Sequence, residues 1–274
     1  MSPIVVAVAI VVAGVGVAAW AGRARILAGA LTAVVLVAGL VLYVPRFVSS
    51  GRPADDALTV LTSNVMLGRA DVDAIAALVR DNDVDVLAVQ ELTAEAAERI
   101  AASTIASDLP HAFVRPDVLA QGSAIYSRFP MSSHARLDGF TFATLTATVE
   151  APRRGDVQVF AVHPIPPPHV VRWDSELDRL GNAMRSVRAE RPVIALGDFN
   201  STLDHPQFRR LLTDGLRDAG ALAGAGLIPT YPTDKWYPPV VGIDHVVVRG
   251  LEASSVTAHD IPGSDHRAVL AVLG

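Results

Sequence analysis

Val193-Ile194-Ala195-Leu196-Gly197-Asp198-Phe199-Asn200-Ser201-Thr202 is the most informative segment of the chain. Its four leading apolar residues are typical of a short buried strand. We expect Gly197 to let the chain turn, so that Asp198 and Asn200 emerge at the carboxyl end of that strand. Ligands bind at this edge in open α/β sheets, and alternate residues of an extended segment share one face. Asp and Asn are also common turn residues, so the segment alone leaves a plain turn as an equal interpretation.

The part of the chain that leads up to this segment alternates between strands and helices. Apolar runs predict strands over residues 58–66 and 84–89. Asp71 is placed to cap a helix that extends to about residue 81, and Thr93 to cap another that extends to about residue 105. This alternation indicates an α/β domain.

The rest of the chain is predicted to contain more antiparallel strands, because turn residues separate closely spaced apolar runs. A long amphipathic helix is expected immediately before the central segment, with apolar residues at helical spacing. The predicted strands cover residues 123–127, 140–150, 157–162, 243–248, 256–259 and 268–273, and the predicted helices cover 172–190 and 206–212.

Composition limits the class of protein. The 274 residues are 51% hydrophobic, carry a formal net charge of −5 and include no cysteine. The absence of cysteine excludes a disulfide framework and a thiolate zinc site. The hydrophobic fraction is high for a wholly soluble protein, which directs attention to an apolar N-terminus.

Two uncharged runs, residues 3–20 and 26–44, predict a transmembrane helical hairpin over residues 1–44. Each run would span roughly 27 Å as a helix, close to the thickness of a bilayer's hydrocarbon core. A cleaved signal peptide fits less well, since the first run lacks a basic start and a second run follows it. Arg23 and Arg25 favour a cytoplasmic turn, which places the domain outside the cytoplasm as part of a multi-pass cell-membrane protein. Residues 45–57 read as a linker, and residues 58–274 as the catalytic domain.

Polar residues that could carry chemistry recur at the ends of the predicted strands. Taken singly, each could be a turn residue or a structural histidine. Their shared placement indicates one site at one edge of the fold, since residues at strand ends converge there. These residues are Asn64, Glu91, His163, Asp198, Asn200, Asp244, Asp265 and His266.

Six short motifs at these positions resemble the endonuclease/exonuclease/phosphatase superfamily, and they occur in the family's order. The resemblance implies a deoxyribonuclease-like four-layer α/β/β/α sandwich. Two departures lie near the substrate side: Gly242 stands where many relatives have arginine, and a proline-rich run follows His163. The motifs are Ser63-Asn64-Val65, Val89-Gln90-Glu91, Val162-His163, Gly197-Asp198-Phe199-Asn200, Ile243-Asp244-His245 and Ser264-Asp265-His266.

This resemblance implies hydrolysis of phosphate esters with Mg²⁺ or Mn²⁺ as the cofactor. Oxygen ligands suit these cations, and Glu91, Asn64 and Asp265 are the candidates. His266, oriented by Asp244, and Asp198 are alternative general bases for the attacking water. His163 and Asn200 are then expected to donate to the phosphoryl oxygens.

Three functions are compatible with these motifs. The first is a membrane-anchored phosphohydrolase acting on a lipid-linked or envelope phosphate, a layout similar to that of teicoplanin-resistance-associated members of the superfamily. The second is an anchored nuclease, which charge disfavours: residues 1–50 hold three arginines and no acidic residue, so the net charge of −5 becomes −8 for residues 51–274. The third is a binding module without activity, for which the loss of a motif residue is expected and none is lost.

Overall fold

Two six-stranded mixed sheets form the centre of the protein. The computed structural model describes residues 24–49, 56–152 and 154–274. The first sheet has the strand order β11 (Ala253–Asp260), β12 (Arg267–Leu273), β1 (Leu58–Asn64), β2 (Val86–Gln90), β4 (Ser123–Ser127) and β3 (His111–Arg115). The second has the order β5 (Met131–Arg136), β6 (Leu145–Ala151), β7 (Gly155–Val162), β8 (Val193–Asp198), β10 (Asp244–Arg249) and β9 (Arg217–Asp218).

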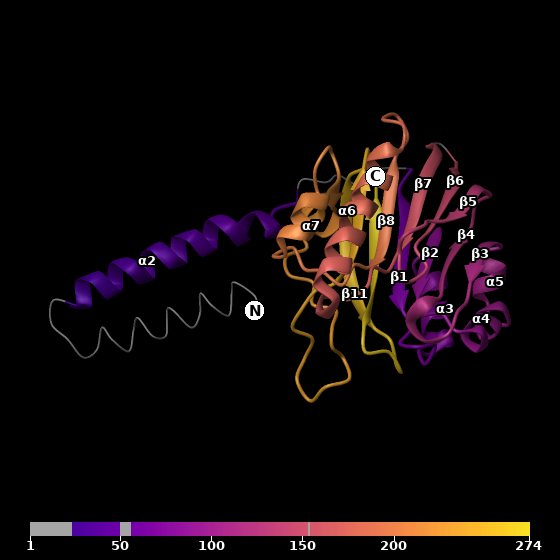
Figure 1. Ribbon diagram of the computed structural model, residues 1–274, viewed down its shortest axis with the longest axis horizontal. Coiled ribbons are helices and arrows are strands. Elements are labelled where there is room, and N and C mark those ends of the chain that lie inside the picture. Colours follow the sequence, from indigo (N-terminus) through magenta and orange to yellow (C-terminus); the bar gives the residue numbers. More distant parts are fainter. Residues whose placement is uncertain (1–23, 50–55, 153) are drawn as a thin grey trace.

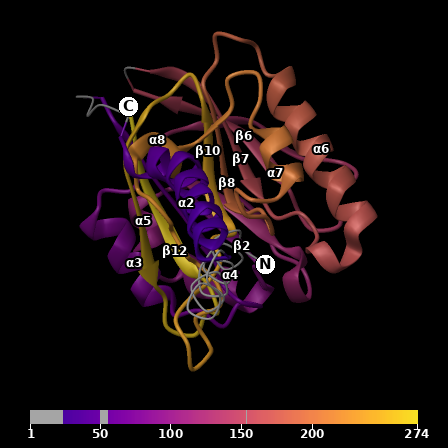
Figure 2. The same ribbon diagram turned by 90° about the vertical axis from the view of Figure 1, so that its left-hand side faces the viewer.

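Helices cover the outer face of each sheet, so the domain has the predicted α/β/β/α layering (Figures 1 and 2). One apolar cluster lies between the sheets, and a further cluster lies under the helices on each outer face. Burial of these clusters is the main favourable term for a domain of this size. The first sheet is covered by α3 (Val72–Asp81), α4 (Ala94–Ala101) and α5 (Ile105–Asp108), and the second by α6 (Val170–Ser186) and α7 (Pro206–Leu211).

Strand direction brings the polar strand ends to one edge of the sandwich. β1 and β2 run parallel, as do β7 and β8, so each parallel pair ends at a common edge. β10 is antiparallel to β8 and β12 is antiparallel to β1, so these two strands begin where their partners end. Asp244 at the start of β10 therefore lies opposite Asp198 at the end of β8.

Gly197 does not turn the chain, contrary to our expectation, because β8 continues through it to Asp198. Gly197 lies opposite Val162 of β7 with a φ of 152°, and an added Cβ would lie 2.0 Å from the carbonyl oxygen of Val162. A glycine is required here because only a residue without Cβ permits this close approach of two backbones.

Most predicted elements are present, with corrections to their lengths. The side chain of Asp71 caps α3 and that of Thr93 caps α4, as expected from the sequence. The helix predicted from Thr93 to residue 105 ends at Ala101, and a separate short helix, α5, follows it. The predicted strand over 140–150 begins only at Leu145. Among the described strands and α-helices, β3, β5, β9 and α8 (Ala219–Ala223) were also not predicted.

The first helix of the described residues is α2 (Ala24–Tyr43), which extends away from the sandwich (Figure 1). In the part of the chain that the structure describes, no helix is both long and apolar enough to cross a membrane. The structure therefore does not show the predicted hairpin, and its first span, residues 3–20, lies outside the described residues.

The segment predicted as a linker, residues 45–57, is ordered at its start. It follows α2 as the 3₁₀ helix η1 (Val44–Phe47), which packs against the domain. The Arg46 guanidinium lies 3.3 Å from the carboxylate of Asp204, and the Arg46 carbonyl accepts a hydrogen bond from Gly226 N. These contacts fix the base of α2 next to the loop that follows β8.

We predict that Gly197→Ala lowers the free energy of unfolding by about 3–5 kcal/mol, because the new methyl group overlaps the backbone of β7. Gly155→Ala is the matched control: its φ of 74° is also positive, but nothing lies within 4 Å of the added Cβ. The control should lose only about 1–2 kcal/mol from backbone strain. Urea unfolding followed by circular dichroism measures both, and equal losses would contradict the close-approach argument.

Candidate active site

Asp198 is the buried centre of the candidate site, with 2% of its surface exposed. Its Oδ1 accepts a hydrogen bond from Asn200 N at 2.8 Å, and its Oδ2 accepts one from Asn64 Nδ2 at 3.2 Å. The Nε2 atoms of His163 and His266 lie 3.6 Å and 3.8 Å from the same Oδ2. Burial raises the pKa of Asp198, and the charge of His266 opposes that rise.

His266 is held by Asp244 on the side away from Asp198. His266 Nδ1 lies 2.9 Å from Asp244 Oδ2, and both side chains are buried. Burial alone lowers the pKa of the imidazole, but the carboxylates of Asp244 and Asp198 outweigh it and raise the pKa to about 10. His266 is therefore an imidazolium at neutral pH, and its stabilising effect is complete below pH 6.5 and lost as the pH rises through about 10.

Asn64 and Glu91 connect the ends of β1 and β2 to Asp198. Asn64 Nδ2 donates to Glu91 Oε1 at 3.1 Å as well as to Asp198, while its Oδ1 accepts from Met66 N at 2.9 Å. Leu67 N donates to Glu91 Oε2 at 2.9 Å, and Glu91 has a φ of 58°. A left-handed glutamate is uncommon, and such backbone conformations concentrate at functional sites. The Asn64 amide thus orients the carboxylates through its nitrogen.

His163 and Asn200 lie on the other side of Asp198. Burial lowers the pKa of His163, and the charge of Asp198 opposes that effect, so the imidazole is neutral at neutral pH. Asn200 has a φ of 49° and donates from Nδ2 to Pro164 O at 3.0 Å, which leaves its second amide hydrogen for another acceptor. Two N–H donors can therefore meet an anionic oxygen beside Asp198.

These residues surround one cleft of about 460 Å³. All eight residues predicted from strand ends are in this arrangement: six line the cleft, while Asn64 and Asp244 reach it through hydrogen bonds to Glu91, Asp198 and His266. The six are Glu91, His163, Asp198, Asn200, Asp265 and His266.

The structure adds supporting residues that the sequence reasoning missed. Tyr231 packs its ring 4.8 Å from that of His266, and Phe142 packs its ring 4.8 Å from that of His163, which fixes both imidazoles. Ser264 Oγ donates to Asn64 O at 2.7 Å and accepts from His266 N at 3.0 Å, so it joins β1 to the start of β12. Ser264 is the first residue of the Ser264-Asp265-His266 motif, and that motif was the feature of the sequence that could have identified it as part of the site.

The donor set fits a divalent cation. Glu91 and Asp265 both face the cleft; burial raises the pKa of Asp265, the charge of His266 opposes that rise, and the charge of Glu91 adds to it. A cation would relieve this repulsion, and carboxylate oxygens are the ligands that Mg²⁺ and Mn²⁺ favour. Polar atoms of Asp198, Asp244 and His266 also lie within 4.8 Å of one another, but the imidazolium of His266 has no lone pair for a metal and compensates the two carboxylates instead.

We predict that Asp244→Asn lowers kcat by about 10²- to 10⁴-fold and moves the alkaline limb of the kcat–pH profile to lower pH. Losing the carboxylate removes a charge that keeps His266 protonated to about pH 10. The control is Asp85→Asn, a carboxylate that accepts from Thr59 N at the opposite end of β1 and should leave the profile in place. An unshifted alkaline limb in Asp244→Asn would exclude this role for Asp244.

Several solved structures share this fold. D. rerio TDP2 complexed with a single-strand DNA product is 15% identical with a TM-score of 0.67, and the match covers 80% of this chain and 100% of that one. An endonuclease/exonuclease/phosphatase from Beutenbergia cavernae DSM 12333 is 22% identical with a TM-score of 0.63, covering 80% and 71%. A family protein from Leptotrichia buccalis C-1013-b is 14% identical with a TM-score of 0.64, covering 79% and 99%.

Sequence comparison gives the family. No curated protein matched the chain. The sequence model of the Endonuclease/Exonuclease/phosphatase family matches residues 61–266, from β1 to His266, and so includes every residue of the candidate site. The match covers well over half of the chain. The protein therefore belongs to the Endonuclease/Exonuclease/phosphatase family.

Proposed function

We propose that the protein is a divalent-metal-dependent phosphohydrolase that is held at a membrane and cleaves a phosphate ester, phosphodiester or pyrophosphate of a lipid-linked or envelope molecule. The family generally hydrolyses phosphate esters. The observation that carries the proposal is the buried carboxylate of Asp198 between two imidazoles, 3.6 Å and 3.8 Å away, in a cleft that Glu91 and Asp265 also line.

Asp198 is the group that we assign as general base. A general base has to be unprotonated, and the imidazole of His266 holds its proton up to about pH 10. The raised pKa of Asp198 makes its carboxylate a better proton acceptor than an exposed one. His266 then supplies positive charge beside the reacting group, and Asp244 positions it.

His163 and Asn200 are assigned to the phosphoryl oxygens. Both line the cleft next to Asp198, and both can donate an N–H. Donors fixed by the fold need no reorganisation as negative charge builds on those oxygens, which is why such groups lower the barrier.

We assign the cation to Glu91 and Asp265. A bound Mg²⁺ or Mn²⁺ would neutralise charge on the phosphoryl group and stabilise the leaving oxygen. Asn64 keeps the Glu91 carboxylate in place, since it donates to Glu91 Oε1 while Leu67 N donates to Oε2. Each carboxylate oxygen retains a lone pair for the metal.

A membrane-associated substrate is supported by the apolar surfaces of the chain. Residues 3–20 and 26–44 are uncharged runs, and α2, which contains most of the second run, exposes several large apolar side chains, among them Val34 and Val41. Near the cleft in sequence, a loop exposes Trp236 to 95% and the first turn of α6 exposes Val171 to 85%. Aromatic and aliphatic side chains in such positions favour a lipid interface. The layout shared with teicoplanin-resistance-associated members and the extracytoplasmic location remain part of this proposal.

A nuclease is the alternative. The D. rerio protein with bound single-strand DNA product shares the fold at 15% identity. The net charge of −8 on residues 51–274 opposes binding of a polyanion, because nucleic-acid affinity depends on neutralising phosphates.

We predict that excess chelator abolishes hydrolysis of a soluble phosphodiester, and that Mg²⁺ or Mn²⁺ restores it. Glu91→Gln should raise the metal concentration needed for half-maximal activity by about 10- to 100-fold, because it removes a charged ligand. Glu95→Gln, an exposed residue at the start of α4, is the matched control and should keep the wild-type metal dependence. Full activity in chelator would refute the metal-dependent mechanism.

We predict that removing residues 1–43 lowers the rate on a vesicle-embedded phosphate ester at least tenfold and leaves the rate on a short soluble analogue within about twofold, since tethering raises effective concentration only for substrates on the same surface. The truncation keeps η1, whose contacts with the domain are thereby preserved. Both proteins are also assayed on plasmid DNA. Equal losses on both esters would contradict the membrane role, and fastest cleavage of DNA would favour the nuclease.

A further inference from the structure

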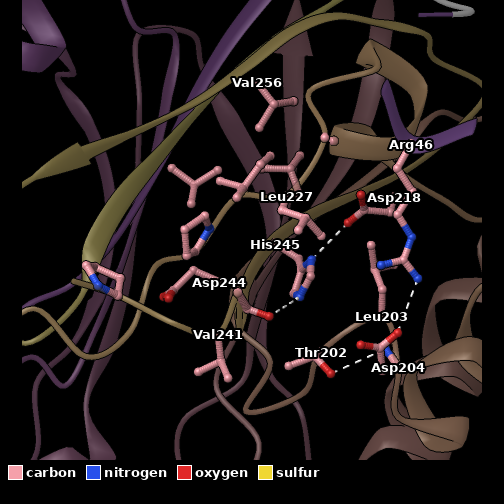
Figure 3. Close-up of a pocket in the computed structure, with 18 of the residues that line it drawn as sticks. Arg46, Thr202, Leu203, Asp204, Asp218, Leu227, Val241, Asp244, His245 and Val256 are labelled. Atoms are coloured by element: carbon pink, nitrogen blue, oxygen red, sulfur yellow. Dashed lines mark hydrogen bonds and ion pairs between the residues drawn. The ribbon is translucent and has the colours of Figure 1, made fainter. Parts of the chain in front are cut away.

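A second cavity, of about 610 Å³, lies against the catalytic cleft. Thr202, His205 and Val241 line both spaces, so the two share a wall. Asp244, which holds His266, also lines the second cavity. Figure 3 shows His245 in the middle of this cavity, with Val256 and Leu227 on one side and Thr202 and Val241 on the other.

Both ring nitrogens of His245, the buried histidine of this cavity, face acceptor atoms of the protein. His245 Nδ1 lies 2.9 Å from Asp218 Oδ2, and its Nε2 lies 2.9 Å from Ser201 O and 3.2 Å from Gly242 O. Both ring nitrogens face acceptors, so both carry a proton. Burial lowers the pKa of His245, but the hydrogen bond and charge of Asp218 outweigh this and raise it. The ring thus has no nitrogen left for a ligand.

Most other charged groups of the cavity are also paired; the exception is Asp244, whose Oδ2 lies 2.9 Å from His266 Nδ1 but whose Oδ1 has no hydrogen-bond partner among the described residues. Asp218 accepts from Ala221 N with its second oxygen, at 2.9 Å, and so caps α8. Arg46 of η1 pairs with Asp204 at 3.3 Å, as the dashed line in Figure 3 marks. Except at Asp244, a ligand that relied on its own charge would therefore have to break an existing pair, which is costly for buried groups.

Most of the remaining lining is aliphatic, and it comes from β10, β11, β12, the loop between β8 and α7, and the segment between α8 and β10. Such a surface, with most of its charged groups already paired, favours an apolar ligand, and the volume is within the range of about 300–1,000 Å³ that holds small molecules. The aliphatic residues are Leu203, Leu227, Ile228, Val240, Val241, Val246, Val256 and Val269.

The cavity joins the catalytic cleft to the base of α2. Its wall on one side is Val241 and Thr202, next to the phosphate site, and on the other side it reaches Arg46 in η1, which follows α2 directly. An alkyl chain of a substrate that extends from an apolar surface near α2 toward the catalytic cleft would therefore reach this cavity first. Leu227 and Val240 are lining residues that also remain partly exposed, and they mark its opening.

We infer that this cavity, named the chain pocket, binds the aliphatic chain of a phosphorylated lipid whose phosphate group lies in the catalytic cleft. This inference rests on the proposed phosphohydrolase function and names its substrate class. A nucleobase fits less well, because most charged groups of the pocket are already paired with one another and the aliphatic side chains offer its edge no hydrogen bond.

The test uses alkyl p-nitrophenyl phosphodiesters with methyl, hexyl and dodecyl groups, which keep the leaving group constant. The full-length chain in phospholipid nanodiscs is assayed with metal for kcat/KM on each ester. Val256→Phe fills the pocket from β11, and Thr257→Phe is the matched control, since Thr257 is exposed on the opposite face of the same strand. Leu227→Trp, at the exposed opening, is the second variant in case Val256→Phe does not fold.

We expect kcat/KM in the wild type to rise with chain length, by up to about fourfold per methylene that enters the pocket. The dodecyl-to-methyl ratio should fall at least tenfold in Val256→Phe and in Leu227→Trp, and should stay at the wild-type value in Thr257→Phe. Partition of the esters into the nanodisc affects all proteins alike, so it cancels from this comparison. A ratio that is the same in all four proteins would overturn the chain pocket while leaving the phosphohydrolase function intact.

A binding measurement separates the two proposals further. n-Dodecanol has no phosphate, so its equilibrium binding to the full-length chain, followed by titration calorimetry, does not depend on catalysis. Binding that Val256→Phe abolishes and Thr257→Phe retains supports the pocket even if no ester is hydrolysed, in which case only the proposed function fails. Absence of pocket-dependent dodecanol binding overturns the inference whatever the hydrolysis result.

Discussion

The close approach of β7 and β8 at Gly197 and Val162 determines where the site can form. Because Gly197 has no Cβ, the two strands remain paired to the last residue of β7, with Val162 opposite Gly197. His163 and Asp198 follow at once, so an imidazole and a carboxylate meet with 3.6 Å between them. The antiparallel partner β10 then begins with Asp244 opposite Asp198. The positions of His163, Asp198 and Asp244 thus depend on the backbone contact between Gly197 and Val162.

Charge balance explains how so many ionisable groups share a buried edge. An isolated buried carboxylate is costly, and Asp198 and Asp244 lie close together. The imidazolium of His266 lies between them, 2.9 Å from one carboxylate and 3.8 Å from the other, and compensates their charge. Glu91 has no ion pair among the described residues, and Asp265 has only the more distant His266, whose Nε2 lies 3.9 Å from its Oδ1; both carboxylates face the open cleft. The site is therefore divided into a compensated interior and an acidic rim suited to a metal.

Charged groups are also compensated around the chain pocket, but the rest of the lining differs from that of the catalytic cleft. His245 and Asp218, and Arg46 and Asp204, compensate each other in its wall. No acidic rim accompanies them there, and most of the remaining surface is aliphatic. Two neighbouring spaces therefore differ in their lining: the cleft brings together the catalytic carboxylates and imidazoles, and the chain pocket adds a group of aliphatic side chains, with Thr202, His205 and Val241 between them. Amphiphilic phosphates combine a polar group and an apolar chain in one molecule.

The sequence by itself determined most strands approximately, the helix caps at Asp71 and Thr93, and the eight polar residues that lie near strand ends, because apolar periodicity and short motifs are local properties. It could not assign strand direction at β10 and β12, nor detect short polar strands such as β3 and β5, since their pairing depends on distant partners. Gly197 was predicted as a turn for the same reason: its close neighbour, Val162, is distant in sequence. Only the tertiary structure decided that His266 is charged, that Asn64 directs its nitrogen to the carboxylates, and that an apolar pocket adjoins the cleft. These properties arise from groups that are far apart along the chain and meet only in the folded protein.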